Sequence, residues 1–174
     1  MSDPGAITTL NYRAQAREIF DWFFSMYFNG ESHEVNGESV VFPDCDIVFE
    51  NEQLPLSLPK PRIRIRIEGG GSSSMRLRSG NSRNVVTDVD VSFWVIVPKA
   101  RGAQLAGART RDRVQGLIES LLVCFGFVLG TRGLRPHSVS DDVVVEESPH
   151  YAISTRSAAF YVTRLYAHSD PIER

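Results

Sequence analysis

The chain has 174 residues and a mass of 19.5 kDa, with 19 basic and 21 acidic side chains, a net charge of -2 and a pI of about 6.1. That length fits a single ordinary domain, and a net charge so near zero excludes a polybasic, histone-like protein. Two cysteines, Cys45 and Cys124, are too few for a disulfide scaffold, and the longest apolar run, residues 121–129, is shorter than the roughly 20 residues that span a bilayer.

The first predicted element is a helix between residues 11 and 28. We expect it to open a domain that spans residues 11–168, after a flexible segment at 1–10 and before a tail at 169–174. The acidic start of the chain predicts no signal peptide. Six of the 17 aromatic residues fall between Phe20 and Phe28, on nearly every side of the last two turns. A helix of this kind is covered on more than one side, so we expect it to pack on a sheet.

Short strands are predicted at residues 39–42 and 47–49, followed by an extended, proline-rich segment at 54–61. Strict alternation of arginine and isoleucine over residues 62–67 then predicts a strand with one apolar and one basic face. A second long strand is expected at residues 83–97, where valines and Phe93 share one parity.

These two strands are expected to form a long hairpin. We predict a register in which Arg62 lies opposite Asp90 and Arg64 opposite Asp88, since that register joins the two apolar faces and pairs opposite charges. The connection of about 14 residues is long for a hairpin loop, and such loops are typically mobile or functional.

A second helix is predicted at residues 103–124, ended by Gly126 and Gly130, with an outer face that carries Arg109, Arg111 and Arg113. Two closing strands are expected near residues 142–147 and 151–166. This order of elements predicts an α+β fold, with a mostly antiparallel sheet covered on one face by two helices and extended by the long hairpin.

Charge is unevenly spread along the chain. Residues 1–60 hold 3 basic and 10 acidic side chains, residues 61–113 hold 11 and 4, and residues 114–174 hold 5 and 7. Arginine supplies 17 of the 19 cations, and its planar, bidentate contacts with carboxylates and phosphates suit interfaces. Pairing of these charges inside one subunit is the alternative.

The candidate interaction residues therefore form two sets. The basic set, on the hairpin and an arginine face, is Arg62, Arg64, Arg66, Arg76, Arg78, Arg83, Arg109, Arg111 and Arg113. The acidic set, for an interface or a channel lining, is Asp44, Asp46, Glu50, Glu52, Asp141, Asp142, Glu146 and Glu147.

No pattern indicates an active site. The triple glycine at residues 69–71 lacks the Gly-Lys-Ser/Thr ending of a phosphate-binding loop, and no Gly-x-Ser-x-Gly elbow is present. The four histidines are scattered and make no zinc-binding spacing. We expect no catalytic residue, no cofactor and no metal.

Two uses of the charge remain open. The basic middle segment could bind nucleic acid, although its loop has no aromatic residue to stack on bases. Alternatively, unlike patches of neighbouring copies could meet head to tail, and such contacts close into a ring when the rotation allows.

The layout resembles the tail terminator (tail-completion, or neck) proteins of tailed bacteriophages. The matching features are the aromatic first helix, the approach Pro59-Lys60-Pro61 to the strand at 62–67, and the long hairpin at 68–84. The strand at 89–97, the helix around 111–122 and two closing strands to Tyr166 complete the resemblance, which covers residues 11–167.

The resemblance implies a structural, non-enzymatic role in the virion, with assembly in the host cytoplasm. Such proteins form a ring, commonly of six copies, that caps the tail tube, stops its growth and docks the head or its connector. The implied partners are other copies of the chain, the tail tube protein, a head-completion protein and DNA that passes through the lumen without sequence recognition. Carboxylates in such a lumen would repel the phosphate backbone. Another neck protein, a head-completion stopper or connector, is the alternative within this class.

Overall fold

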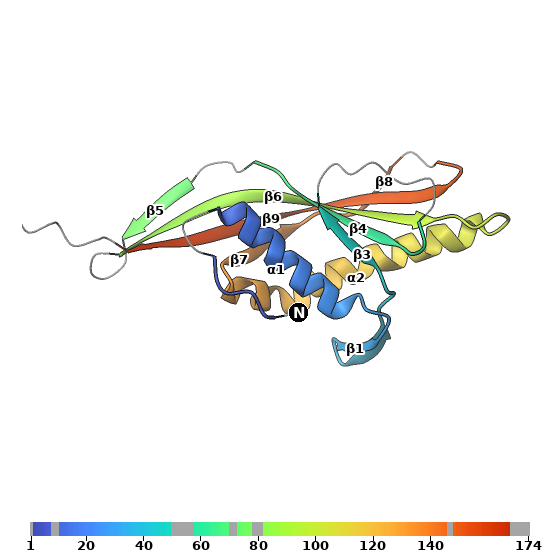
Figure 1. Cartoon of the computed structure of the whole chain (residues 1–174), viewed down its shortest axis with the longest axis horizontal. Helices are drawn as coiled ribbons and strands as arrows, with labels where there is room; N and C mark the ends of the chain where they lie inside the picture. The colour runs from blue at the N-terminus through green and yellow to red at the C-terminus, as the bar shows by residue number, and fades with distance from the viewer. Residues whose placement is uncertain are drawn as a thin grey trace, which may run out of the picture.

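A computed structural model describes residues 2–7, 11–49, 58–69, 73–77, 82–145 and 148–167. Two helices, α1 (Tyr12–Tyr27) and α2 (Gln104–Thr131), are separated by strands (Figure 1). The strands are β1 (Ser32–Val35), β2 (Glu38–Val41), β3 (Asp46–Phe49), β4 (Arg62–Ile67), β5 (Ser73–Leu77), β6 (Ser82–Pro98), β7 (Leu134–Val139), β8 (Val143–Val144) and β9 (Tyr151–Ala167).

The fold is α+β, as the sequence predicts. The main sheet has the order β3-β4-β6-β9-β7, with β5 also paired to β6 and β8 also paired to β9, while β1 and β2 form a small separate sheet. Strands β3 and β4 pair in parallel, an arrangement that the sequence analysis did not anticipate, and each of the other pairs is antiparallel. In Figure 1 the β6–β9 pair runs along the molecule and extends with β5 beyond the ends of both helices.

The strand pair β6–β9 is the centre of the fold. Its register runs without a break from Ser82 opposite Ala167 to Pro98 opposite Tyr151, close to the predicted bounds. Side chains alternate between the two sides of a strand, so Phe93 and Phe160 lie on the inner, fully buried side. Their neighbours Trp94 and Tyr161 lie on the outer side, where they remain partly exposed.

Strand β4 has the predicted alternation but a different register. Ile63 and Ile65 are fully buried opposite Val95 and Phe93, so the apolar faces meet as expected. Arg64, however, lies opposite Trp94, six residues beyond the predicted partner Asp88.

The predicted register is wrong because β5 occupies the part of β6 that was assigned to β4. Ser73 of β5 pairs with Thr87, so the chain leaves β4 early and resumes pairing with β6 through a second short strand. Val89 lies between these two pairing regions, and the aspartates on either side of it face no arginine of β4. The long hairpin is therefore completed by β5 and β6, and its residues 78–81 lie outside the described part.

Helix α1 supplies the aromatic side of the core. Phe20 and Phe24 are fully buried, and their rings lie 6.0 and 5.4 Å from the ring of Phe93. Phe20 also meets Phe160 edge to face at 5.3 Å. Edge-to-face contacts between aromatic rings add to the stabilisation from burial alone, so this cluster holds α1 against the central strands.

Helix α2 is longer than predicted because it continues through Gly126 and Gly130, the two glycines that were expected to end it. Gly126 lies inside the helix, where an added Cβ would be 2.5 Å from Cγ of Pro136 on β7. The helix ends instead before Gly133, which has φ +90° and lies against the carbonyl oxygen of Thr163. A left-handed residue just after the last turn is the usual helix stop.

The length and apolar composition of α2 would also allow it to cross a membrane, a possibility that a count of uninterrupted apolar residues missed. Buried residues such as Val114, Ile118 and Leu121 place the helix in the hydrophobic core, and core helices of water-soluble domains share this composition.

The N-terminal segment also contacts the body. Ile7 is buried in the core, and its backbone N–H donates to the carbonyl oxygen of Arg132 at 3.1 Å. The guanidinium of Arg132 forms an ion pair with Asp3. The sequence predicted a flexible segment at residues 1–10 and did not indicate these contacts.

Candidate interaction surfaces

The predicted arginine row on β4 lies on the outer side of the sheet. Arg62 and Arg64 are half-buried there, opposite Ile96 and Trp94. Arg66 is more exposed and lies 3.8 Å from the carboxylate of Glu68, a long and weak ion pair. The row therefore exists, although it lies beside aromatic and aliphatic side chains where the sequence predicted aspartates.

The three arginines predicted to share one face of α2 lie on two different sides of the helix. Arg111 is only 5% exposed and donates to Asp112 at 2.9 Å, so it does not belong to an outer face. Arg113 is exposed, and its Nη2 donates to the carbonyl oxygen of Val41 at 2.8 Å. Arg109 is exposed and makes no ion pair with any described residue. A rotation of about 100° per residue puts Arg111 on the opposite side from its two neighbours.

The hairpin arginines are only partly described. Arg76 lies on β5 opposite Asn84, and Arg83 lies on β6 opposite Leu77 and Tyr166. Arg78 and the side chains of the other two arginines fall outside the described part of the structure.

Two predicted acids are held by one lysine. Nζ of Lys60 lies 3.1 Å from Oδ1 of Asp44 and 3.4 Å from Oδ1 of Asp46. The hydrogen bond to Asp44 is the main cause of a raised pKa for Lys60, which keeps the lysine charged. Lys60 therefore offsets one of the two negative charges within the same chain.

In the second group of predicted acids, the negative charge of Asp142 is offset by an arginine of the same chain. Arg156 on β9 is 3% exposed, and its Nη2 lies 3.4 Å from Asp142 and 3.2 Å from Glu119. Its Nη1 donates to the carbonyl oxygen of Ser140 at 2.6 Å. Asp141 is exposed. The remaining predicted acids, Glu50, Glu52, Glu146 and Glu147, lie outside the described residues.

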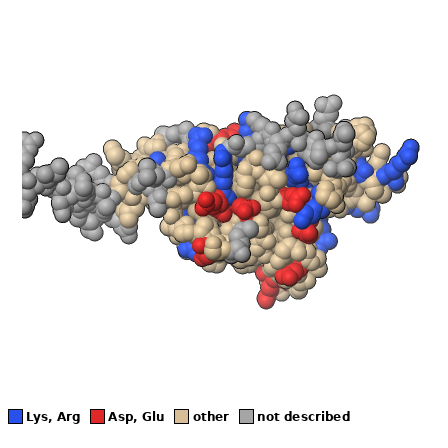
Figure 2. Space-filling view, in the orientation of Figure 1, with Lys and Arg blue, Asp and Glu red and all other residues tan. Residues whose placement is uncertain are grey.

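The acidic surface that the sequence analysis missed is the β1–β2 hairpin. Glu34 and Glu38 are exposed on it and make no ion pair with any other described residue. Its two-residue turn, Asn36 and Gly37, has φ values of 53° and 79°, the signature of a tight type I′ turn. The Asn-Gly pair in the sequence was the signal for this hairpin. Figure 2 shows red atoms gathered at the lower edge of the view, where β1 lies in Figure 1.

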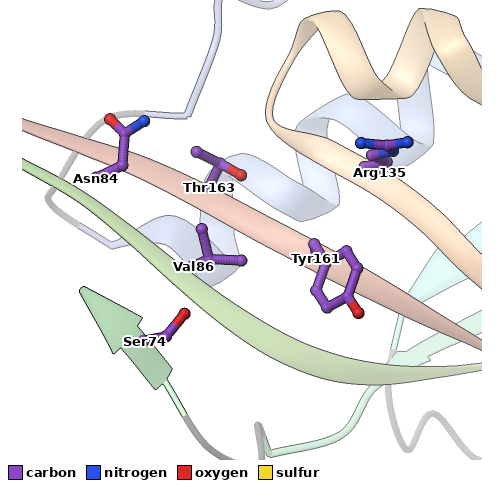
Figure 3. Close-up of a pocket in the computed structure, with 6 residues that line it drawn as sticks. All are labelled: Ser74, Asn84, Val86, Arg135, Tyr161 and Thr163. Carbon is purple, nitrogen blue, oxygen red and sulfur yellow. The ribbon is translucent and has the colours of Figure 1, made fainter. Parts of the chain in front are cut away.

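A polar groove crosses the outer side of the sheet where β5, β6, β9 and β7 lie next to one another (Figure 3). Its volume is about 550 Å³, and its lining residues are Ser74, Asn84, Val86, Arg135, Tyr161 and Thr163. Arg135 is exposed and forms no ion pair with a described residue. Because its lining combines the β5–β6 hairpin with β7 and β9, which are distant from it in sequence, no local pattern could have indicated this groove.

Next to the groove, His137 of β7 lies flat against Tyr161, with ring centroids 4.0 Å apart and planes at 18°. Its Nε2 is 2.9 Å from Oδ1 of Asp88. Asp88, predicted to pair with Arg64, is therefore engaged across the sheet by a histidine.

Two further features bear on chemistry. Within the described residues, no cluster of three or more histidine, cysteine or acidic side chains is arranged to hold a metal ion. Burial, with a smaller contribution from Asp44, raises the pKa of the Cys45 thiol from 9.0 to about 12, so this thiol stays protonated and unreactive near neutral pH.

The exposed side of α2 carries Val123 and Phe127, one turn apart and 69% and 68% exposed. Large apolar side chains in such a position are typical of surfaces that contact another molecule.

Neither a scan against models of known protein families nor a search of curated protein sequences gives a match to this chain.

Proposed function

We propose that this protein is a structural subunit of a ring, with six copies as the expected number, at the head-proximal end of a phage tail. There it stops polymerisation of the tail tube and joins the tail to the head or its connector. Its partners are neighbouring copies of the chain, the tail tube protein and a head-completion protein, and DNA passes through the lumen. In this proposal the chain is a virion protein and not an enzyme.

The arrangement of elements supports the proposal. An aromatic helix, a strand, a long hairpin, a second helix and closing strands follow one another in the order on which the resemblance rests. We further propose that the sheet functions as a mostly antiparallel layer with both helices on one face, so that the other face is available to neighbours. Core residues from both helices belong to the same cluster as Phe93, which supports this arrangement.

The observation that carries the proposal is the placement of uncompensated charge. Glu34 and Glu38 project on the β1–β2 hairpin, whereas Arg101, Arg109 and Arg135 are exposed on other elements. Within the described residues, no ion pair joins these acids to these arginines. Unlike surfaces on one subunit favour head-to-tail association, in which the acids of one copy meet the arginines of the next.

Imaging of the assembled particle by cryo-electron microscopy tests the proposal directly. We expect one ring of this chain where the tail tube ends below the head. Density for the chain along the tube or in the capsid shell would overturn the placement. A ring directly on the head vertex would assign the protein to the head-completion class.

The long hairpin formed by β5 and β6 offers a second test, which separates an effect on assembly from an effect on folding. Arg76→Glu combined with Arg78→Glu is expected to lower the yield of complete particles while the monomer unfolds at an unchanged denaturant concentration. Arg76→Lys with Arg78→Lys keeps the charge and is the matched control. An unchanged particle yield for the glutamate variant would remove the hairpin arginines from assembly.

A further inference from the structure

The groove on the outer side of the sheet has the character of a site for an acidic side chain. Its lining offers donors from a guanidinium, an amide and three hydroxyl groups, and it includes no carboxylate. Within the described part of the chain, the side chains of Arg135, Asn84 and Ser74 have no hydrogen-bond or ion-pair partner. A ligand that supplies acceptor oxygens and negative charge complements this set of donors.

The groove is also held in place before any ligand binds. Val86 and Thr163 stand on the unbroken β6–β9 pair, and they point from it into the groove (Figure 3). His137 stacks on Tyr161 and holds the carboxylate of Asp88, the nearest acid on the same side of β6. A preorganised site of this kind loses little conformational entropy on binding.

The β1–β2 hairpin projects from the body as a rigid element, and its acidic side chains complement the donors of the groove. Val35 is 6% exposed, and His33 meets the ring of Phe42 at 5.3 Å, so the base of the hairpin is anchored in the body. Its tight turn leaves Glu34 and Glu38 exposed on either side of the tip.

The hairpin cannot fill the groove of its own chain. In Figure 1, β1 lies below the helices, whereas β5 and the adjoining ends of β6 and β9 lie at the far left of the sheet. Two complementary surfaces that are separated on one molecule fit a heterologous contact between copies.

We propose that the β1–β2 hairpin of one copy docks in the Arg135 groove of the next, with Glu34 or Glu38 accepting hydrogen bonds from the Arg135 guanidinium. This inference rests on the proposed ring and specifies its subunit contact. A contact of this type weakens as ionic strength rises, because its charges lie near the protein surface.

Site-specific cross-linking of the full chain tests the contact. A photoreactive residue at Asn36 is introduced into isotopically labelled protein and mixed at about 1 mM with unlabelled protein, since even weak association is populated there. We expect cross-links from Asn36 to residues 82–86 or 161–163 of the other isotopic form. Intermolecular cross-links only to other surfaces, such as the N-terminal end of α2, or a chain that remains monomeric, would overturn the inference.

Charge reversal provides an independent test. Arg135→Glu alone, and Glu34→Lys with Glu38→Lys alone, are each expected to weaken self-association by at least tenfold. Mixing the two variants should restore it, because each mixed interface then has one acidic and one basic partner. Arg13→Glu and Glu18→Lys change exposed charges on α1, away from the groove and the β1–β2 hairpin, and serve as matched controls. Equal weakening by the controls, or no rescue on mixing, would contradict the assigned contact.

Other occupants of the groove give distinct results. Retention of duplex DNA by the wild-type chain at low salt, lost in Arg135→Glu, would make the groove a phosphate site and overturn the proposal. The particle image separates this inference from the proposed function. A ring joined through other surfaces contradicts only the hairpin contact, whereas a hairpin contact in a protein found elsewhere in the particle contradicts only the neck role.

Discussion

The two sides of the β6–β9 strand pair differ in what they contribute. On the inner side, Phe93 and Phe160 are fully buried against the aromatic rings of α1. On the outer side, Trp94 is half-buried and Tyr161 is 39% exposed beside the polar groove. Around the groove, alternating residues of the same two strands thus face a dry core and a wet, polar surface, whereas Ile96 and Tyr151, toward the other end of the outer side, are buried in a small apolar cluster.

The magnitudes explain this division. Burial of one phenylalanine side chain stabilises a fold by about 1.5–3 kcal/mol, whereas a partly exposed polar contact such as that between His137 and Asp88 contributes about 0–1 kcal/mol. The inner side therefore carries most of the stability, and the part of the outer side around the groove is free to carry groups that suit recognition.

Truncation of an inner aromatic residue should produce the largest effect. Phe20→Ala removes ring contacts with Phe24, Phe93 and Phe160, and we expect it to lower the free energy of unfolding by about 3–5 kcal/mol. Chemical denaturation measures this loss. Met26→Ala changes a residue that is 40% exposed on the same helix, so it should cost within about 0.5 kcal/mol. Similar losses for the two variants would deny that stability is concentrated on the inner side.

The contact between α2 and β7 gives a second prediction. Gly126→Ala would place a methyl group 2.5 Å from the rigid ring of Pro136, so we expect a destabilisation of about 1–3 kcal/mol despite the higher helix propensity of alanine. Gly116→Ala, where nothing lies within 4 Å of the new methyl group, is the control and should stabilise the protein by about 0.5–1 kcal/mol. Thermal or denaturant unfolding measures the change in the free energy of unfolding, which should have opposite signs for the two variants.

Local sequence patterns predicted both helices and the strands β4, β6 and β9, but they missed β1, β5 and β7 and did not give the pairing of β4. The Arg-Ile alternation fixed the faces of β4, because a strand has a period of two whatever its partner. Its register depended on β5, a short strand in a Gly- and Ser-rich segment that has no apolar alternation of its own. Gly126 indicated a helix end, although only the approach of Pro136 explains why glycine is required there.

The candidate site was less predictable, because the sequence shows where charged residues occur but not which of them are buried or paired with an opposite charge in the folded chain. Arg111 was assigned to an exposed face, yet it is buried. Asp44 and Asp46 were assigned to an interface, yet Lys60 pairs with both. Arg135 had no local pattern, since its groove arises only when four strands lie side by side.

The buried thiol of Cys45 predicts a pH dependence. Its pKa of about 12 in the folded state lies above the value of 9.0 expected when unfolded, so the folded state binds the extra proton between these values. The associated stability is fully present below pH 9 and is lost as the pH rises toward 12, by up to about 1.4 kcal/mol per pH unit. Denaturation at pH 8 and pH 10 measures this slope, and Cys45→Ala should flatten it.

Alkylation of the native protein at pH 8 should modify the partly exposed Cys124 and spare Cys45. Modification of both thiols at equal rates would contradict the burial of Cys45.

The smallest effect on stability is expected from the outer side itself. Asp88→Asn keeps a side chain that can hydrogen-bond to His137 but removes its charge, and we expect the free energy of unfolding to change by less than about 0.5 kcal/mol. Self-association should instead strengthen, because a negative charge is lost beside the groove that is proposed to receive the acidic hairpin. Sedimentation at two salt concentrations measures this gain, which should shrink at the higher one. A loss of stability above about 1 kcal/mol with no change in association would mean that the outer side, like the inner one, serves the fold and not recognition.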